Sequence, residues 1–390
     1  MNAIAQNKSI TDTIQYVGVD DKEIRLFESQ YIVPNGVSYN SYVILDDKSV
    51  VMDSVDLRAE KEWFANLETV LGGKEPDYIV VSHVEPDHSG SLQKFMEKYP
   101  HTKLVCNAKT LAMLSQFFTM PADMESVIVK EGDELVLGKH TLTFIMAPMV
   151  HWPEVMVTYE KTEKVLFSAD GFGKFGALDT EEDWACEARR YYFNIVGKYG
   201  MQVQALLKKA AALDIRTICP LHGPVLSENL EYYIGKYQIW SSYEPEDKGV
   251  LIAIASIHGH TKQAAQKLAE LLRSKGVEKV AVADLARDDM AEAIEDAFRY
   301  DRLVVAAATY DTGVFPCMDS FLTRLKSKNF QKRTVGIIEN GSWAPMAGKV
   351  MKERLMEMKE VTILEPVVSI KSALDETSSK QLEELAQALA

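Results

Sequence analysis

Seven side chains of the types that bind metal ions lie beside hydrophobic runs within the first 222 residues. Four of them fall in one hexapeptide, His83-Val-Glu85-Pro-Asp87-His88, which directly follows the hydrophobic run 78–82. The other three are His151, Asp170 and His222, each after or near a later hydrophobic run. Imidazole and carboxylate groups are the usual ligands of zinc, manganese and non-haem iron. Seven ligands exceed the four of one tetrahedral ion, so the pattern predicts a site for two metal ions.

The alternative is that each histidine is an ordinary structural or surface residue. That interpretation suits one isolated histidine better than it suits this set. Four of the eight histidines fall in predicted loops at strand ends, and these loops also contain proline or glycine. His101 and His140 lie in charged turns and are expected to face solvent. Asp53, at the end of the run 49–53, is expected to be structural or to support the ligands.

Three loops in the last 142 residues carry a second set of binding groups. The loop 256–261 joins a hydrophobic run to a helical pattern, and it offers hydroxyls, a glycine and helix N-terminal amides, which bind phosphate well. Such a loop alone is weak evidence, because glycine and serine also occur in ordinary turns. The loops 309–316 and 340–344 follow later hydrophobic runs. Together the three predict one ligand site at the carboxyl edge of a parallel sheet.

The elements that position the metal-binding candidates differ from those that position the three loops. Before residue 241 the predicted strands are 38–45, 49–53, 78–82, 134–137, 141–147, 155–160 and 165–169, and the predicted helices are 92–98 and 111–118. After residue 249 the predicted strands are 250–255, 279–284, 303–308, 334–339 and 361–367, and helical patterns at 261–275, 291–298, 318–325 and 348–358 separate them. Strict alternation predicts βαβ units and a parallel sheet. The polar stretch 241–248 predicts a linker between domains 1–248 and 249–390.

Composition restricts the classes of function. The chain has 390 residues, 43 Lys+Arg against 57 Asp+Glu and a formal charge of −14, which argues against nucleic acid as a partner. No apolar run approaches the roughly 20 residues that cross a bilayer, and the N-terminus lacks the apolar core of a signal peptide. The four cysteines form no Cys-x-x-Cys pair, which argues against structural zinc, iron–sulfur ligation and disulfides. We therefore expect a cytoplasmic protein without membrane contact.

The hexapeptide resembles the His-x-His-x-Asp-His signature of the metallo-β-lactamase fold, with Glu85 in place of the second histidine. This replacement, followed by a flavodoxin-like domain, resembles the flavodi-iron proteins (A-type flavoproteins) over essentially the whole chain. The resemblance implies an α/β protein, with an N-terminal metallo-β-lactamase-like αββα sandwich and a C-terminal flavodoxin-like doubly wound parallel sheet. It also implies the iron ligands. One iron would be bound by His83, Glu85 and His151, the other by Asp87, His88 and His222, with Asp170 as the bridge.

The loop 256–261 resembles the flavodoxin phosphate loop Thr/Ser-x-Thr-Gly-x-Thr, with His258 in place of the middle hydroxyl. The resemblance implies FMN as the second cofactor, with Tyr310 and Trp343 packed beside its isoalloxazine ring. The predicted FMN contacts are Ser256, Ile257, His258, Gly259, His260, Thr261, Thr309, Tyr310, Asp311, Thr312, Gly313, Asn340, Gly341, Ser342, Trp343 and Ala344.

The family that the chain resembles reduces dioxygen to water, nitric oxide to nitrous oxide, or both. Reduced FMN and a di-ferrous pair hold two electrons each, which matches the four that dioxygen needs. Rubredoxin is the usual donor in that family, and the cysteines here cannot build a fused rubredoxin, so a separate small carrier is expected. The resemblance also implies a head-to-tail homodimer or a dimer of such dimers.

Glu85 favours redox chemistry over hydrolysis. Exchanging imidazole for carboxylate adds negative charge, which favours harder and more highly charged ions such as Fe(III). Two alternatives remain: a zinc metallo-hydrolase fused to a flavodoxin domain, and a redox sensor whose metal pair does not turn over.

A basic cluster suggests where the carrier docks. It comprises Arg324, Lys326, Lys328, Lys332 and Arg333, in a C-terminal domain that is otherwise nearly neutral. We predict that this cluster steers a small acidic carrier by opposite charge, the alternative being an ordinary solvated face.

Overall fold

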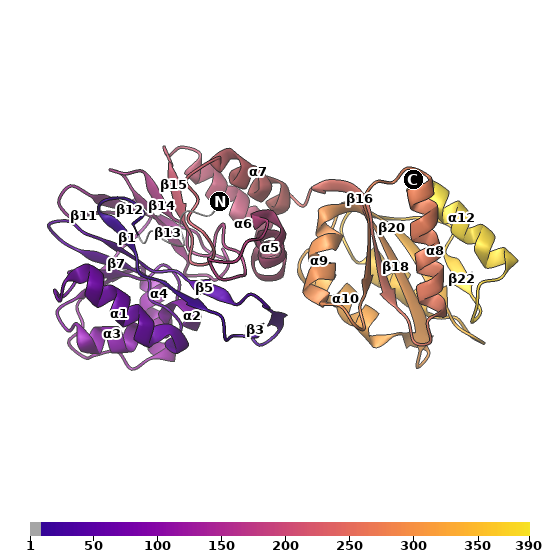
Figure 1. The fold of residues 1–390 in the computed structure, drawn as a ribbon, viewed down its shortest axis with the longest axis horizontal. Helices are drawn as coiled ribbons and strands as arrows, with labels where there is room; N and C mark the ends of the chain where they lie inside the picture. The colour runs from indigo at the N-terminus through magenta and orange to yellow at the C-terminus, as the bar shows by residue number, and fades with distance from the viewer. Residues whose placement is uncertain (1–8) are drawn as a thin grey trace. The chain divides into compact units, whose positions relative to one another are not determined.

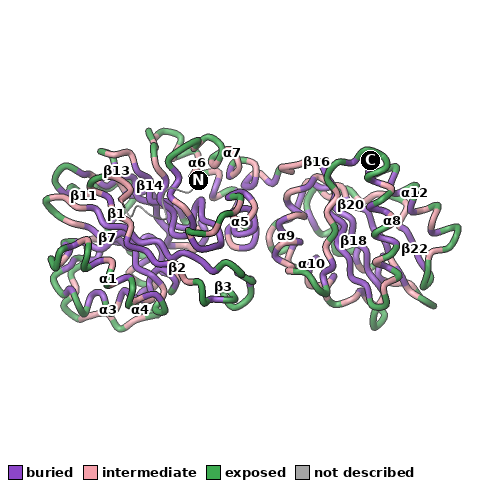
Figure 2. Tube along the Cα trace, in the orientation of Figure 1, coloured by how far each residue is buried: buried purple, intermediate pink, exposed green. Residues whose placement is uncertain are grey.

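The computed structural model describes residues 9–390, which form two compact units. The first unit contains the described residues up to Tyr192 together with Met201–Gln238. The second contains Phe193–Gly200 and Ile239–Ala390. Figure 1 shows the elements of each unit, and Figure 2 shows that the strands lie in the buried interior of both.

The first unit is a sandwich of two sheets. One sheet has the strand order β1 (Ile14–Tyr16), β6 (Tyr42–Ile44), β7 (Val50–Met52), β8 (Tyr78–Val80), β9 (Lys103–Cys106) and β10 (Ser126–Ile128). The other has the order β11 (Glu134–Val136), β12 (Thr141–Met146), β13 (Met156–Glu160), β14 (Val165–Phe167) and β15 (Thr217–Cys219). Residues from both sheets, such as Val80 and Phe144, share one hydrophobic core. The sheets therefore pack face to face.

Helices cover the sandwich, in the αββα arrangement that the sequence predicts. The helices α1 (Glu60–Leu71), α3 (Leu92–Lys98) and α4 (Ala108–Phe117) follow strands of the first sheet, whereas α6 (Gly200–Ala210) and α7 (Leu230–Ser241) flank β15 of the second (Figure 1). A short helix α2 (Pro86–Ser89) directly follows β8, and α5 (Trp184–Tyr191) precedes a π-helical turn, Tyr192–Val196. The small pairs β2 (Val19–Asp21) with β5 (Val37–Tyr39), and β3 (Leu26–Phe27) with β4 (Tyr31–Ile32), complete the unit.

The second unit is a doubly wound parallel sheet. Its strand order is β17 (Val280–Asp284), β16 (Asp247–Ala255), β18 (Tyr300–Tyr310), β20 (Arg333–Asn340) and β21 (Val361–Ile363), and β22 (Val368–Ile370) also pairs with β20. This is the flavodoxin order 2-1-3-4-5. The helices α8 (His260–Ser274) and α12 (Glu376–Leu389) cover one face, and α9 (Met290–Arg299) and α10 (Pro316–Ser327) cover the other (Figure 1). The helix α11 (Ala347–Met356) packs beside α10. The predicted strand 361–367 is in fact two short strands, and β19 (Gly313–Val314) adds a hairpin to β18.

His140 does not face solvent, so that expectation is wrong. Its side chain is buried, and its Nδ1 lies 3.0 Å from an oxygen of Glu160, which is also buried. Its backbone amide donates to Asp46 at 2.7 Å. His140 is therefore buried because Glu160 and Asp46 supply partners for its ring and its backbone amide, although its neighbours in sequence are charged and polar.

The basic cluster is not a wholly free face, because most of its charges are paired within the second unit; the docking of a carrier there stays a prediction. Arg333 is buried and donates to the carbonyl oxygens of Tyr243 and Phe298. Lys332 donates to Ser242 and pairs with Glu244, Lys328 donates to Asn194, and Lys326 pairs with Glu357 at 2.6 Å. Most of this positive charge is used to hold segments of the second unit together.

Across residues 9–390, no helix has both the length and the apolar character needed to span a bilayer.

We propose that the part of the second unit from residue 239 onward folds alone and that residues 239–248 stabilise it. Arg333 Nη1 donates to the Tyr243 carbonyl at 2.8 Å, and Trp240 Nε1 donates to Glu246 at 2.7 Å. A fragment that begins at residue 249 lacks these partners, and a buried donor without its acceptor costs roughly 1–3 kcal/mol. We expect fragment 239–390 to unfold at higher urea than fragment 249–390, measured by circular dichroism, with both fragments folded. Coincident midpoints would show that residues 239–248 add no stability.

Candidate functional site

The metal-binding candidates are placed by strand ends, as the sequence predicts. His83 follows β8, and Pro86 occupies the first position of α2, where its fixed φ favours helix initiation. The turn into α2 carries Glu85, Asp87 and His88 toward the same side as His83. His151 follows β12, Asp170 follows β14 and His222 follows β15. The carboxyl ends of strands from both sheets thus bring all seven residues together.

Four of the seven form a first cluster: His83, Glu85, His151 and Asp170. Their ligand atoms all lie within 4.8 Å of one another. An oxygen of Glu85 lies 3.3 Å from His83 Nε2 and 3.2 Å from His151 Nε2. Asp170 Oδ2 lies 3.4 Å from His83 Nε2 and 3.0 Å from His151 Nε2. Two imidazoles and two carboxylates therefore surround one point.

The other three, Asp87, His88 and His222, form a second cluster. Asp87 Oδ2 lies 3.3 Å from His88 Nε2 and 3.2 Å from His222 Nε2. The other oxygen of Asp170, Oδ1, lies 3.2 Å from His88 Nε2 and 3.9 Å from His222 Nε2. One carboxylate oxygen of Asp170 thus faces each cluster.

Buried atoms without partners fit a pair of cations. The atoms Asp87 Oδ1, Asp170 Oδ1, His222 Nε2 and both ring nitrogens of His88 make no hydrogen bond with the described residues. Buried polar atoms are nearly always hydrogen-bonded, so each exception calls for an explanation. Cations bound between these carboxylates and imidazoles would supply the missing partners of the converging atoms. The nitrogen and oxygen donors suit iron, manganese or zinc.

Without a metal ion, the pKa values of three histidines in the clusters are raised and that of Asp170 is lowered. Burial alone would lower the pKa of His151, but hydrogen bonds to Asp170 and Glu85 raise it to about 9. Against the same effect of burial, Asp170 and other carboxylates raise the pKa of His83 well above its usual value, and Asp87 and Asp170 raise that of His88. Burial would raise the pKa of Asp170, yet the neighbouring histidines hold it well below its usual range. Each histidine proton therefore occupies a place that a metal ion can take.

Two histidines are oriented by partners on the far side of their rings. His83 Nδ1 lies 2.7 Å from Glu154 Oε1, and His222 Nδ1 lies 2.7 Å from the carbonyl oxygen of Ser38. Both contacts leave Nε2 directed at the clusters, as is usual for metal-binding histidines. The same Glu154 oxygen accepts the Val84 amide at 3.0 Å. Sequence reasoning missed Glu154, although it ends the tetrapeptide that begins at His151.

Replacing Glu154 with glutamine should weaken metal binding by roughly 10–100-fold, because such partners set the basicity and orientation of a ligand. The change keeps the shape of the side chain and removes its charge from His83 Nδ1. Competition with a metal chelator measures the affinity. Glu62→Gln, on the exposed side of α1, is the matched control and should leave the affinity unchanged. Equal affinities in the two variants would contradict a role for Glu154.

Aromatic side chains surround the two clusters. The ring of Trp152 lies 5.2 Å from that of His83, and the rings of Phe27 and Tyr191 lie 5.4 and 5.5 Å from that of His222. No sequence pattern pointed to Phe27 or Tyr191, because neither adjoins a predicted strand end. These rings limit the access of water to the histidines.

Glu28 is a further acidic group near the clusters, in the turn of the β3–β4 hairpin. The residue is exposed at the surface, but desolvation by the surrounding atoms together with the negative charges of Glu85 and Asp87 raises the pKa of Glu28 to about 7, against the opposing effect of His151. A carboxyl group with that pKa can hold or release a proton near neutral pH. The sequence did not single it out.

Asp53 lies beneath the first cluster. Its buried carboxylate accepts the backbone amide of Ser82 at 2.6 Å, directly before His83. Burial raises the pKa of Asp53 to about 6. The contact fixes the backbone that carries the first ligand, which agrees with a supporting role.

The three predicted flavin loops meet at the carboxyl edge of the second sheet. Ser256 Oγ accepts the amides of Gly259 and Lys262, at 3.1 and 3.3 Å, which curls the first loop around the start of α8. Gly259 has a φ of 94°, a conformation that favours glycine. Thr309 Oγ1 accepts the amides of Met346 and Ala347, and the Asn340 side chain bonds the backbone of Ser372. Thr309 and Asn340 therefore tie the later loops to their surroundings.

The remaining loop positions leave apolar and aromatic surface uncovered. Trp343 is 92% exposed and Tyr310 is 45% exposed. Ile257, in the first loop, is exposed as well. Large exposed aromatic groups beside a phosphate-binding loop fit a flat cofactor such as the flavin ring, which would cover them.

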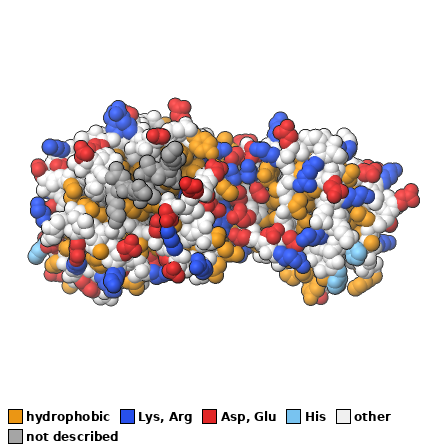
Figure 3. Space-filling model, in the orientation of Figure 1, with side chains coloured by type: hydrophobic (Ala, Val, Ile, Leu, Met, Phe, Trp, Pro, Cys, Tyr) orange, Lys and Arg blue, Asp and Glu red, His pale blue; other side chains and the backbone are white. Residues whose placement is uncertain are grey.

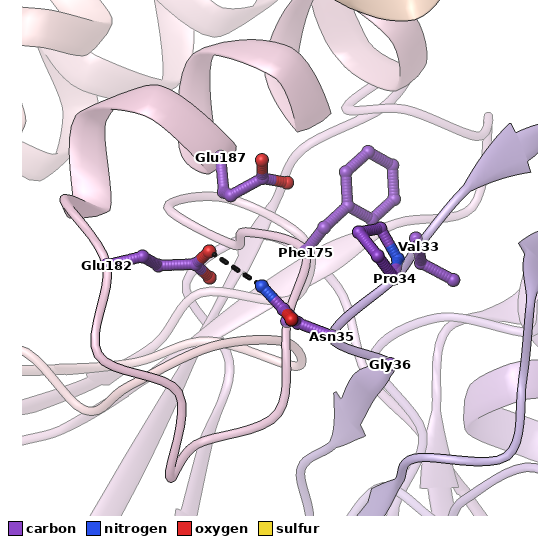
Figure 4. Close-up of a pocket in the computed structure, with 8 residues that line it drawn as sticks. Val33, Pro34, Asn35, Gly36, Phe175, Glu182 and Glu187 are labelled. Atoms are coloured by element: carbon purple, nitrogen blue, oxygen red, sulfur yellow. Dashed lines mark hydrogen bonds between the residues drawn. The ribbon is translucent and has the colours of Figure 1, made fainter. Parts of the chain in front are cut away.

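A small pocket lies apart from both sites. It is lined by residues of the β4–β5 connection, of the segment before α5 and of α5 itself, among them Asn35, Phe175, Glu182 and Glu187 (Figure 4). Asn35 Nδ2 donates to Glu182 at 3.3 Å, and Glu182 also pairs with Lys174. Neither predicted site includes a residue that lines this pocket.

Comparison with known proteins agrees with this architecture. Residues 37–223 match the model of the ODP family beta lactamase, and residues 251–370 match that of a flavodoxin domain. A nitric oxide reductase of Moorella thermoacetica is 32% identical over 378 residues, which cover 93% of each chain.

Two solved structures resemble the whole chain. The flavodiiron protein of Giardia intestinalis superposes with a TM-score of 0.91 at 25% identity, over 98% of this chain and 96% of that one. The rubredoxin oxygen:oxidoreductase of Desulfovibrio gigas superposes with a TM-score of 0.90 at 27% identity, over 98% of each. The predicted fold class is confirmed. With both domain models, a relative above 30% identity and a matching set of metal-binding groups, the chain belongs to the flavodi-iron proteins, oxidoreductases whose cofactors are FMN and a pair of iron ions.

Proposed function

We propose that this protein reduces nitric oxide to nitrous oxide, dioxygen to water, or both, with electrons that a small carrier such as rubredoxin delivers through FMN. The observation that carries the proposal is the shared carboxylate: Asp170 faces one cluster with each oxygen, while Glu85 lies between two histidines of the first. A zinc hydrolase of this fold would have a histidine at position 85. The Moorella relative named as a nitric oxide reductase and the Desulfovibrio oxygen reductase support the same class of substrate.

We assign the ligands as the family resemblance implies. His83, Glu85 and His151 would hold one iron, Asp87, His88 and His222 the other, and Asp170 would bridge them. His88 is included because its Nε2 lies 3.3 Å from Asp87, in the same second cluster, and 3.2 Å from Asp170 Oδ1, the oxygen of Asp170 that faces this cluster. When bound, the iron pair supplies the redox-active centre at which the gas is reduced.

The protein's own residues supply orientation, exclusion of water and protons. Glu154 and the Ser38 carbonyl orient His83 and His222, and the rings of Phe27, Tyr191 and Trp152 shield the clusters. Two nitric oxide molecules need two electrons and two protons to give nitrous oxide and water, and dioxygen needs four of each to give two waters. Glu28, whose pKa lies at about 7, can release a proton toward the site at neutral pH.

We further propose a head-to-tail homodimer, or a dimer of such dimers, in which the flavin of one chain serves the metal pair of its partner. Exposed apolar groups on both regions support it: Trp343 and Tyr310 in the flavin loops, and Leu26 and Ile32 opposite one another on the β3–β4 hairpin. Light scattering of the holoenzyme measures the oligomeric state. A monomer with full carrier-driven activity would contradict the proposed dimer.

The decisive experiment is an anaerobic titration of the fully reduced holoenzyme with each gas separately. We expect stoichiometric reoxidation of flavin and iron, and nitrous oxide or water without hydrogen peroxide as the product. Gas electrodes and gas chromatography follow the reaction. Reduced protein that consumes neither gas would favour a redox sensor. Full zinc occupancy with hydrolytic activity would favour the fused hydrolase. Repeating turnover with rubredoxin and with flavodoxin as the donor tests the proposed carrier.

A further inference from the structure

The second cluster depends on one short loop of the second sheet. The loop comprises residues 220–223 and directly follows β15, and its Gly223 has a φ of 78°, in the left-handed region that favours glycine. It carries His222, whereas Asp87 and His88 of the same cluster lie in α2, next to the first sheet. The position of this loop therefore determines whether the second cluster is complete.

Three buried side chains at the junction of β5 and β6 hold the loop. Asn40 Nδ2 donates to the carbonyl oxygens of Pro220 and Gly223, both at 2.8 Å. Tyr42 Oη donates to the same Pro220 carbonyl at 2.7 Å, and Ser38 Oγ accepts the Gly223 amide at 2.7 Å. Each of the three side chains belongs to a residue that is at most 1% exposed. Both ends of the loop are thus fixed from one segment of the chain.

Asn40 is itself held in one orientation. The two loop carbonyl oxygens can only accept, so the amide nitrogen faces them, and Asn40 Oδ1 accepts from Tyr16 Oη at 3.0 Å. The Asn40 backbone amide also donates to the Leu221 carbonyl at 2.8 Å. Figure 3 shows charged side chains scattered over the visible surface, whereas the side chains that hold this loop are neutral and buried. A buried network in which these donors and acceptors are paired favours one arrangement of the loop.

The same segment fixes the ring of His222. Its Nδ1 lies 2.7 Å from the Ser38 carbonyl oxygen, which can only accept, so Nδ1 carries a proton. The opposite nitrogen, Nε2, lies 3.2 Å from Asp87 Oδ2 in the second cluster. Ser38 therefore holds the loop through its hydroxyl and the histidine ring through its carbonyl.

We propose that Asn40, supported by Ser38 and Tyr42, is a positioning residue for His222, which sets the affinity of the second metal position far more than that of the first. The inference deepens the proposed function, because it rests on a two-metal site at these clusters. The first cluster has a different support, since Glu154 orients His83. Without the Asn40 amide, the loop loses a donor at each end, and His222 is no longer held against Asp87.

The test is Zn(II) binding by the metal-depleted full-length protein with isotope-labelled histidine. Competition with a chromophoric chelator measures the two affinities, and the ring nitrogen resonances identify which histidines bind each ion. In Asn40→Ala, the ion that shifts the resonances of His88 and His222 should bind roughly 10–100-fold more weakly than in the parent. The ion that shifts those of His83 and His151 should bind as it does in the parent.

A second variant and a control complete the set. Ser38→Ala removes the acceptor of the Gly223 amide, keeps the backbone carbonyl and should weaken the same ion by a smaller factor, so the test holds even where the first variant does not fold. Thr102→Val is the matched control. Thr102 is buried and donates to the Pro76 carbonyl at 2.7 Å, just before β9 and at the opposite end of the first sheet from the clusters. The control loses a buried bond of the same kind and should bind both ions as the parent does.

Unchanged affinities in Asn40→Ala and Ser38→Ala, or equal losses at both metal positions, would overturn the positioning role. A parent protein that binds fewer than two zinc ions through these histidines would instead contradict the two-metal site of the proposed function. The metal-free protein then still tests the positioning role. The Nδ1 proton of His222 should exchange with solvent faster in Asn40→Ala than in the parent or in Thr102→Val, and equal exchange rates would overturn the role.

Discussion

Replacing Glu85 with histidine is expected to shift the bound metal from iron toward zinc and to slow gas reduction by about a hundredfold or more. An oxygen of Glu85 lies 3.3 Å from His83 Nε2 and 3.2 Å from His151 Nε2, at the centre of the first cluster. Imidazole at this position removes one negative charge and gives the cluster three histidines and one carboxylate. That donor set suits zinc, and it stabilises Fe(III) less well than the native set does.

Metal analysis of protein expressed in iron- and zinc-supplemented media measures the first effect, and gas electrodes measure the second. Glu85→Asp retains the charge and should retain iron, with a smaller loss of activity. Glu62→His places a histidine on exposed α1 and controls for adventitious zinc. If Glu85→His keeps two irons and native turnover, the carboxylate does not determine the metal.

The metal clusters could be predicted because strand ends are local features. The run 78–82 corresponds to β8, and the run 141–147 to β12, so the loops after them were located within a residue or two. Residues at the carboxyl ends of strands in two packed sheets must converge, whatever the details of the helices. The pattern of residue types in those loops then identified all seven members of the two clusters.

Residues that act through distant contacts could not be predicted in the same way. Phe27 contacts His222 from a two-residue strand with no periodic pattern, and Tyr191 reaches the same ring from α5. Glu154 bonds His83 across 71 positions of sequence. Nothing in the flanking residues of these side chains signals the partner.

Burial of charge misled the sequence interpretation for a related reason. His140 and Arg333 occur among polar neighbours, which usually indicates a surface. Both are buried because their partners come from elsewhere: Glu160 for the histidine, and the Tyr243 and Phe298 carbonyls for the arginine. A buried charge is tolerated where such partners exist, and the local sequence does not reveal them.

Metal binding is expected to release about two protons per chain at pH 7, and the apparent affinity should rise roughly a hundredfold per pH unit below pH 9. In the metal-free site, contacts with the carboxylates raise the pKa of His151 to about 9, and those of His83 and His88 are also raised. His151 and His83 therefore hold the two protons at pH 7 that metal binding releases. A metal ion binds only the neutral ring, so each ligand must first lose its proton.

The raised histidine pKa values also determine how the stability of the metal-free protein changes with pH. A histidine with a raised pKa stabilises the folded metal-free protein fully below its unfolded value of about 6.5, and this contribution is lost as the pH rises through about 9. The melting temperature of chelator-treated protein should therefore fall as the pH rises from 6.5 to 9. The melting temperature of the metal-loaded protein should fall much less over the same range.

Anaerobic titration with Fe(II) or Zn(II) in weak buffer, with a pH indicator, counts the protons directly. His101→Gln changes an exposed histidine outside the clusters and should release the same number. Release of no protons at pH 7 would mean that the four histidines of the clusters do not bind the ions. Because the carboxylates of the clusters are ionised whether protons or metals occupy the site, the two kinds of cation compete for the same places, and acid should remove iron before it unfolds the sandwich.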